Sequence, residues 1–233
     1  FVVSYNKKSA KSLIEVLDGE VEVKANAESV SKRFFTGNSA LVSDDKLRSI
    51  ETREERQLTS KAILTADNKL RISTAVGRGM DQAIDFSKTT KNKHPHFLTV
   101  KNPLDELRRK SYIKFDIASL RTDFVKNVKL TLHFVPTGYG NTYHLPEEAT
   151  FEVYGLTDES LDNWTESSLN WANAPGNVDK ADELDFSKIT KVGEFSFNRS
   201  VRERKIHISG SELHDFIKSD TNDLVTLIVI RTS

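Results

Sequence analysis

The chain has 233 residues, of which 37% are hydrophobic and 29% are charged, and this length suits one sizeable core with an appendage or two small domains. Its 34 basic and 34 acidic residues balance, so no overall field would recruit nucleic acid or an anionic membrane. The lack of cysteine excludes disulfides and thiol catalysis, and no apolar run approaches the roughly 20 residues that a membrane-spanning helix needs.

The first 25 residues carry the signal of a β-hairpin. Two alternating runs, Leu13–Leu17 and Glu20–Val23, are joined by Asp18 and Gly19, and Asp-Gly between such runs is a strong hairpin signal. Because two or three strands cannot form a core of their own, we expect residues 1–25 to end an upstream domain of a longer protein. With the strand-like run Phe1–Tyr5 before it, this segment resembles the end of a FecR-like domain, a β-rich module of bacterial envelope proteins.

Residues 26–62 are polar and are expected to form a linker. Ser43, followed by Asp44 and Asp45, is a good helix start, because serine caps the first N–H groups and acidic residues favour the first turn. The next run, Lys46–Arg56, is rich in helix formers but lacks a wide apolar stripe. The sequence therefore predicts a short, largely solvated helix inside this linker.

Residues 63–233 show the periodicity of strands. Apolar and polar side chains alternate at 112–117 and 128–134, which predicts strands with one buried and one solvated face. The run Leu224–Ile230 is apolar at nearly every position, as in a central strand covered on both sides. With one late helical segment, Ser211–Lys218, the pattern predicts an all-β fold, a β-sandwich.

Both tryptophans, Trp164 and Trp171, lie in one segment that follows a strand ending in Tyr154 and Gly155. This segment, Asn163–Pro175, fits neither helical nor strand periodicity, so it predicts an ordered loop held by aromatic packing. Large aromatic residues are highly buried on average. We expect the indoles to anchor the loop, with a role as stacking platforms for sugar as the alternative.

The order of motifs in this region is similar to that of a known family. Val-Tyr-Gly, Trp-Thr-Glu and Trp-x-Asn-x-Pro follow one another as in the DNRLRE-type modules, jelly-roll domains of secreted bacterial proteins that act on polysaccharides. Strand patterns at 97–102, 109–117 and 128–134 occur in the same order. The resemblance covers about Ile63 to Ser233. It implies a jelly roll, non-catalytic polysaccharide binding, and a location outside the cell or at the bacterial cell surface.

Strand alternation places several aromatic rings and cations on the faces that we expect to be solvated. These residues are Tyr112, Lys114, Lys129, His133 and Tyr154, and the loop at 136–144 adds Tyr139 and Tyr143. Sugar rings stack on aromatic faces, and uronate or sulfate groups favour basic side chains. We therefore expect a monomeric module that binds an acidic polysaccharide. An ordinary solvated sheet face is the alternative, because scattered exposed rings and lysines are common.

A structural calcium ion is a further expectation, because jelly-roll modules such as those it resembles often carry one. Calcium prefers carboxylate and carbonyl oxygens, and Asp67, Asp81 and Asp85 lie in the irregular N-terminal part of the module, where we place the ligands. The pair His94 and His96 is interpreted as part of a surface loop, since no cysteine or third histidine is near in sequence.

Catalysis by this chain is not expected. The sequence contains no nucleophile motif, phosphate-binding glycine loop or zinc-helix motif. Two alternatives stay open: a structural or adhesive surface module without a glycan ligand, and a polysaccharide lyase or hydrolase whose acid–base residues would be defined by geometry.

Overall fold

The computed structural model describes residues 2–6, 11–16, 20–26, 31–35, 39–43, 46–49, 62–65, 69–86, 98–102, 108–120, 122, 125–135, 147–178, 183–198, 200 and 204–232. The chain divides into two compact units, residues 1–78 and 79–233. Each unit is built from antiparallel strands.

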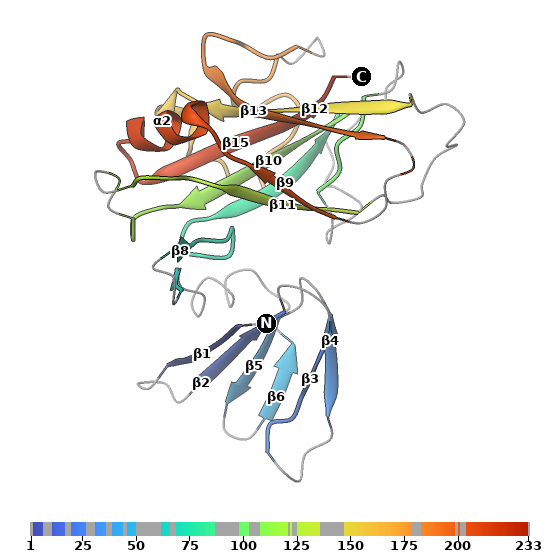
Figure 1. The fold of residues 1–233 in the computed structure, drawn as a ribbon, viewed down its shortest axis with the longest axis vertical. Coiled ribbons are helices and arrows are strands. Elements are labelled where there is room, and N and C mark those ends of the chain that lie inside the picture. Colours follow the sequence, from blue (N-terminus) through green and yellow to red (C-terminus); the bar gives the residue numbers. More distant parts are fainter. Residues whose placement is uncertain are drawn as a thin grey trace. The chain divides into compact units, whose positions relative to one another are not determined.

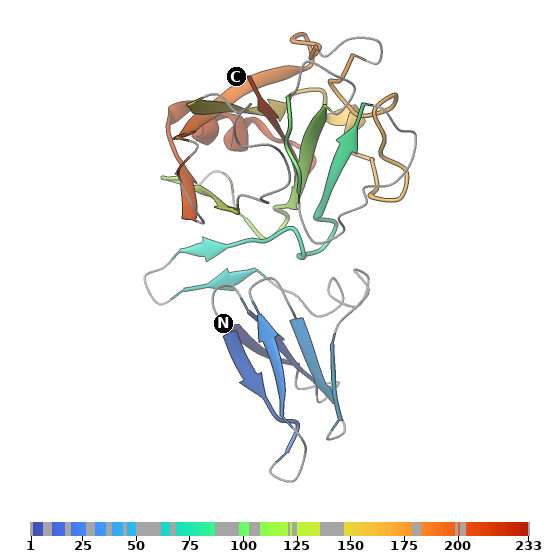
Figure 2. The same cartoon turned by 90° about the vertical axis from the view of Figure 1, so that its right-hand side faces the viewer.

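The N-terminal unit contains a four-stranded sheet in the order β1-β2-β5-β6 (Figures 1 and 2). Its strands are β1 (Val2–Asn6), β2 (Lys11–Glu15), β5 (Ser39–Ser43) and β6 (Lys46–Ser49). Two further pairs are β3 (Glu20–Val23) with β4 (Lys32–Phe35) and β7 (Ile63–Leu64) with β8 (Leu70–Arg71). A small core joins Ile14, Val16, Val23, Phe34 and Ala40.

The predicted hairpin between Leu13 and Val23 is wrong in its pairing, although both strands are present. Leu13 lies opposite Ser4 on one side and Leu41 on the other. Both edges of β2 are therefore occupied by β1 and β5, and β3 pairs with β4 instead. The strands on either side of Asp18 and Gly19 share a core but not a ladder, and residues 17–19 lie outside the described part of the chain.

The predicted helix from Lys46 is wrong over its first four residues, which form strand β6. Val42 lies opposite Leu47 in the β5–β6 ladder, and Leu47 packs against the small core. This long-range pairing and burial outweigh a helix propensity that differs by only tenths of a kcal/mol per residue. Residues 50–56 lie outside the described part.

The C-terminal unit is centred on a five-stranded antiparallel sheet in the order β13-β12-β15-β10-β9 (Figure 1). These strands are β13 (Ile189–Asn198), β12 (Glu148–Leu156), β15 (Leu224–Arg231), β10 (Arg109–Asp116) and β9 (Met80–Asp85). The apolar run at 224–230 is the central strand, as predicted. Because β12 and β10 flank it, its backbone donors and acceptors are satisfied on both sides.

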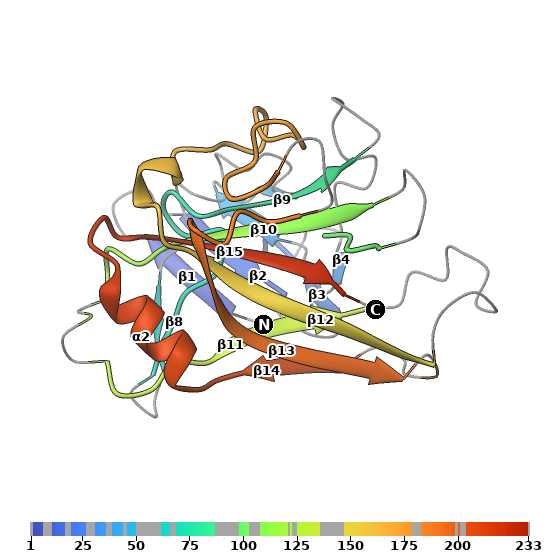
Figure 3. The same ribbon diagram turned by 90° about the horizontal axis from the view of Figure 1, so that it is seen from above.

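One face of this sheet is covered by β11 (Leu130–Phe134), β14 (Arg204–Ile208) and helix α2 (Ser211–Ser219), which lie beside β12 and β13 in Figure 3. Two glycines allow the close approach. A Cβ on Gly155 would lie 2.5 Å from the Phe216 ring of α2, and one on Gly193 would collide with Ile208 of β14. The predicted helix at 211–218 is confirmed.

The predicted all-β class is confirmed: strands dominate, and the described residues include a single α-helix with the short 3-10 turn η3 (Glu159–Leu161). The sheets pack as a sandwich, and the jelly-roll topology stays a prediction. No helix in the described part of the chain is long and apolar enough to cross a membrane.

Candidate functional site

The second face of the five-stranded sheet is covered by the segment that holds both tryptophans. We call residues 157–178 and 183–188 the tryptophan loop; it lies beside β9 and β10 in Figure 3. Strand alternation points Lys110, Tyr112 and Lys114 of β10 to this face. All three are buried, with exposed fractions of 3%, 0% and 3%. The tryptophan loop therefore packs against the polar side chains of β10.

Lys114 and Tyr112 bind the backbone of this loop. The Lys114 ammonium donates to the carbonyl oxygens of Asp162 at 2.9 Å and Trp164 at 2.7 Å, and lies 4.6 Å from the centre of the Trp164 ring. The Tyr112 hydroxyl donates to the Pro175 carbonyl at 3.1 Å. Burial raises the pKa of Tyr112, so its hydroxyl stays protonated and serves as a donor.

Lys110, four residues before Lys114 and on the same face of β10, repeats the arrangement of Lys114. Its ammonium donates to Asn177 Oδ1 at 2.8 Å and to the Glu183 carbonyl at 3.2 Å. It also lies 4.6 Å from the centre of the Trp171 ring, an attractive cation–π geometry.

The expected outward placement of Tyr112 and Lys114 is wrong, because a loop distant in sequence covers that side. Trp164 and Trp171 are 7% and 4% exposed, so they anchor the loop and do not present a ring to a sugar. A hollow of about 240 Å³ opens beside Trp164. Its polar lining is used within the loop: Asn173, for example, accepts from the Asn170 N–H at 2.8 Å and donates to the Ser168 carbonyl at 2.8 Å.

A cationic surface lies on the outward side of the β11–β14 pair. The register sets Thr131 opposite His207, with 3.1 Å between Thr131 Oγ1 and His207 Nδ1, and sets His133 opposite Lys205. Lys129 immediately precedes β11, and all five side chains are exposed. We call these residues, Lys129, Thr131, His133, Lys205 and His207, the basic face. Neighbouring strands lie about 4.8 Å apart, so these side chains form one compact group.

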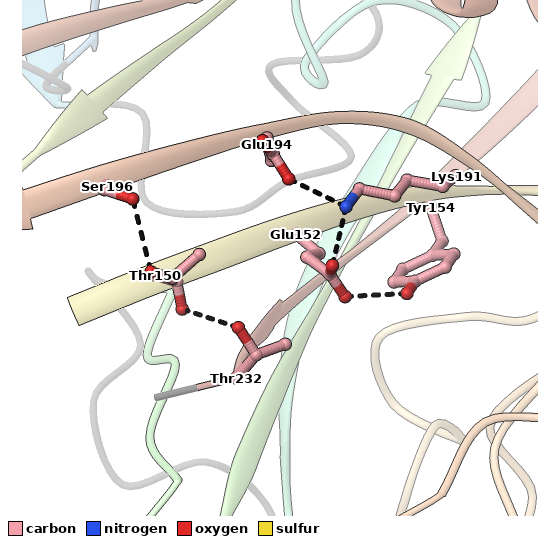
Figure 4. A network of polar contacts seen from close by, with 7 residues as sticks. All are labelled: Thr150, Glu152, Tyr154, Lys191, Glu194, Ser196 and Thr232. Carbon is pink, nitrogen blue, oxygen red and sulfur yellow. Dashed lines mark hydrogen bonds and ion pairs between the residues drawn. The ribbon is translucent and has the colours of Figure 1, made fainter.

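A second exposed surface is formed by side chains of β12 and β13 together with Phe186, and Figure 4 shows its polar contacts. The Lys191 ammonium contacts Glu152 at 2.6 Å and Glu194 at 2.8 Å. The Tyr154 hydroxyl donates to the other oxygen of Glu152 at 2.7 Å, and the Tyr154 ring meets Phe186 edge-on with centroids 5.8 Å apart. We call Glu152, Tyr154, Phe186, Lys191 and Glu194 the Phe186 surface.

The charges of this surface hold one another in place. Burial acts to raise the pKa of Glu152, but hydrogen bonds from Lys191 and Tyr154 and the charge of Lys191 leave that pKa below its ordinary value. Burial and the bond to Glu152 raise the pKa of Tyr154 to about 12. Hydrogen bonds to Glu152 and Glu194 raise the pKa of Lys191. Near neutral pH Glu152 is thus ionised, Lys191 is charged and Tyr154 keeps its proton.

The sequence pattern of carbohydrate-binding module family 96 matches residues 74–210, more than half of the chain. The chain belongs to carbohydrate-binding module family 96. It therefore carries a non-catalytic carbohydrate-binding module, and both exposed surfaces lie within the matched residues. A search of curated proteins gave no match. The DNRLRE-type and FecR-like resemblances stay predictions.

The predicted ligand residues are divided among different environments in the family 96 module. Lys129 and His133 lie together on the basic face, whereas Tyr112 and Lys114 are buried. Tyr154 is 6% exposed and contributes to the Phe186 surface mainly through its hydroxyl. The predicted residues Tyr139 and Tyr143 lie outside the described part of the chain.

Sequence reasoning missed Lys205, His207 and Phe186. The alternation Lys205-Ile206-His207-Ile208 is itself a strand signal with a lysine and a histidine on one side, and it would have added β14 to the site. Phe186 is a lone ring in a polar turn, and nothing in its sequence neighbourhood distinguishes a buried ring from an exposed one.

The predicted calcium ligands do not converge where the structure describes them. Asp81 and Asp85 are four residues apart on β9, which separates their Cα atoms by about 13 Å at strand rise. Asp85 pairs with Arg109 at 3.1 Å. Asp67 lies outside the described residues, and those described include no group of three His, Asp or Glu side chains able to hold a metal.

A carboxylate cluster lies where the start of the tryptophan loop, at η3, meets the turn before β15. Asp162 is 1% exposed, and its Oδ1 has no hydrogen-bond partner among the residues that the structure describes. Burial raises the pKa of Asp162. Burial also raises the pKa of Asp220 to about 6, and repulsion from Glu159, Asp162 and Asp223 adds to this shift.

Proposed function

We propose that the family 96 module binds an acidic polysaccharide through its basic face. The observation that carries this proposal is the register of β11 and β14, which gathers two lysines and two histidines on one exposed surface. Uronate and sulfate groups are anions that accept charge-assisted hydrogen bonds from such donors. The hydroxyl of Thr131 adds a donor and acceptor for sugar hydroxyl groups.

The proposed role is attachment, with the module serving a larger secreted or surface protein. Carbohydrate binding without catalysis follows from the family, and an acidic polymer suits the charge of the basic face. A structural calcium ion held in part by Asp67 is kept as a proposal. Chelation lowering the melting temperature would support it, because an ion that binds only the native state stabilises that state by mass action.

Affinity electrophoresis in a polyuronate, a sulfated galactan and an uncharged glucan tests the proposed ligand class. Native protein should be retarded by the two charged polymers, and added salt should weaken the retardation, because exposed charges are screened over about 8 Å at physiological ionic strength. Lys129→Ala with Lys205→Ala should weaken binding on the order of threefold to tenfold, since exposed ion pairs contribute about 0.2 to 1 kcal/mol each.

The matched control is Lys24→Ala with Lys32→Ala, which removes the same charge from exposed positions of the N-terminal unit. It should leave the retardation unchanged. Equal retardation of the native protein and the basic-face variant would refute the assignment. Release of reducing or unsaturated ends from the polymer would show a catalytic activity instead of simple attachment.

A further inference from the structure

Phe186 is presented to solvent on a rigid turn. Phe186 is 67% exposed, whereas Leu184, two residues earlier, is buried at 6%. The Asp185 carboxylate accepts from the Ser187 N–H at 3.1 Å and the Ser187 hydroxyl at 2.6 Å. The Lys188 N–H donates to the Asp185 carbonyl at 3.0 Å, and the Asp185 N–H donates to the Gly176 carbonyl at 2.9 Å. The ring is therefore held outward by a backbone fixed on both sides.

The exposed ring is joined to the carboxylates by one residue. Tyr154 touches the Phe186 ring at an interplanar angle of 60° and donates from its hydroxyl to Glu152. Glu194, with a side chain 65% exposed, lies on the far side of Lys191. The Phe186 ring thus adjoins Tyr154, and Figure 4 shows Tyr154 and Lys191 both bound to the carboxylate of Glu152.

The chemistry of this surface favours an uncharged ligand. Two carboxylates against one ammonium leave an excess negative charge, which repels uronate and sulfate groups. Each carboxylate has about four lone-pair sites, so Glu152 and Glu194 keep acceptor capacity for sugar hydroxyl groups beyond their contacts with Lys191 and Tyr154. The apolar C–H face of a hexose can stack on Phe186 as other apolar groups pack on aromatic rings.

The Phe186 surface and the basic face are on opposite sides of the sandwich. Phe151 and Phe197 point toward β11, where both contact the Phe134 ring. Because successive side chains of a strand alternate, Glu152 and Glu194 point away from β11 and β14. One ligand-binding surface therefore cannot be an extension of the other.

We propose that the Phe186 surface is a second carbohydrate subsite, which takes an uncharged, hydroxyl-rich sugar ring. This inference rests on the carbohydrate-binding function of the family 96 module but not on its preference for acidic polymers. A module with two such subsites on opposite sides can engage two polysaccharide chains at once.

Affinity electrophoresis in uncharged glucan, mannan and galactan, with the polyuronate run in parallel, tests the subsite. Phe186→Ala should weaken binding to the uncharged polymer that retards the native protein by about threefold to tenfold, as expected for loss of an aromatic contact. Phe186→Trp should retain that binding and Phe186→Leu should not, because the stacking face and not mere apolarity is required. Polyuronate binding should be unchanged in all three variants.

The basic-face variant Lys129→Ala with Lys205→Ala should show the converse pattern: it should lose binding to the polyuronate and keep binding to the uncharged polymer. Failure of that variant alone would refute the proposed function and leave the second subsite standing. The subsite is overturned if no uncharged polymer retards the native protein, if Phe186→Ala binds it as the native protein does, or if Phe186→Ala loses polyuronate binding. Melting temperatures should match throughout, since Phe186 is 67% exposed.

Discussion

A lysine on the polar face of an alternating strand need not face solvent. Lys110 and Lys114 lie on the polar side of β10, yet each packs on a tryptophan ring and donates to acceptors of the tryptophan loop. Their stems bury apolar surface while their ammonium groups replace water with fixed carbonyl oxygens. At the scale of the residue, these lysines are part of the fold, whereas Lys129 and Lys205 of the basic face are exposed.

Lys114→Ala should lower the free energy of unfolding by about 2 to 4 kcal/mol, because the buried carbonyl oxygens of Asp162 and Trp164 lose their donor. Lys129→Ala is the matched control and should change stability by no more than about 0.5 kcal/mol, as is usual for exposed positions. Urea unfolding followed by circular dichroism measures both. Equal, small effects of the two substitutions would contradict the role of Lys114 in holding the tryptophan loop.

Asp220 should make the unfolding free energy depend on pH. Its pKa rises from 3.8 to about 6 in the folded state, so the folded state holds the proton more tightly. Its contribution to stability therefore increases as pH falls through about 6 and is complete below 3.8, and above pH 6 the ionised carboxylate destabilises the fold. The neighbouring charges are Glu159, Asp162 and Asp223, together with Lys114 near Asp162.

Asp220→Asn keeps an oxygen for the Asp223 N–H, which now donates to Asp220 Oδ1 at 2.8 Å, and removes the charge. The variant should be more stable than the native protein above pH 6, and the difference should disappear toward pH 4, near the ordinary Asp pKa of 3.8. Denaturant unfolding over this pH range measures the difference. A stability difference that does not vary with pH would show that this carboxylate does not titrate as described.

At the scale of the element, sequence patterns predicted where strands and the helix lie better than they predicted which strands pair and which segments cover them. Alternation placed Ile113 and Lys114 on opposite faces of β10 correctly, but it carries no information about a loop that covers the polar face from 50 residues away in sequence. The Asp18-Gly19 signal is local, whereas the edges of β2 are filled by residues distant in sequence. Segment 211–219 was predictable because its apolar residues follow helical spacing on one side.

Trp171→Ala should destabilise the module by about 3 to 5 kcal/mol, the range for truncating a buried tryptophan. It removes the ring that packs on Lys110 and, edge-on, on Phe86 at 5.1 Å. Phe186→Ala is the aromatic control, and it should leave stability nearly unchanged because the ring is exposed. Thermal unfolding compares the two. Strong quenching of tryptophan fluorescence by a glycan, with little loss of stability in Trp171→Ala, would reverse this assignment.

At the scale of the whole molecule, the equal numbers of basic and acidic residues in the chain conceal an uneven distribution of charge over the module's surfaces. The outward side of β11 and β14 is cationic, and the opposite side of the sandwich carries the excess negative charge of Glu152 and Glu194. The family assigns carbohydrate binding, and these two surfaces would divide it by the charge of the sugar. The net charge of the chain could not reveal this separation of charge, because it sums over both surfaces.

Charge reversal tests the central claim most directly. Calorimetric titration of a polyuronate into Lys129→Glu with Lys205→Glu should show no binding heat under conditions in which the native module saturates, because the carboxylates introduced on the basic face repel the polymer. Lys24→Glu with Lys32→Glu, which changes net charge equally on the N-terminal unit, should bind as the native protein does. Undiminished polyuronate binding by the basic-face reversal would contradict the account.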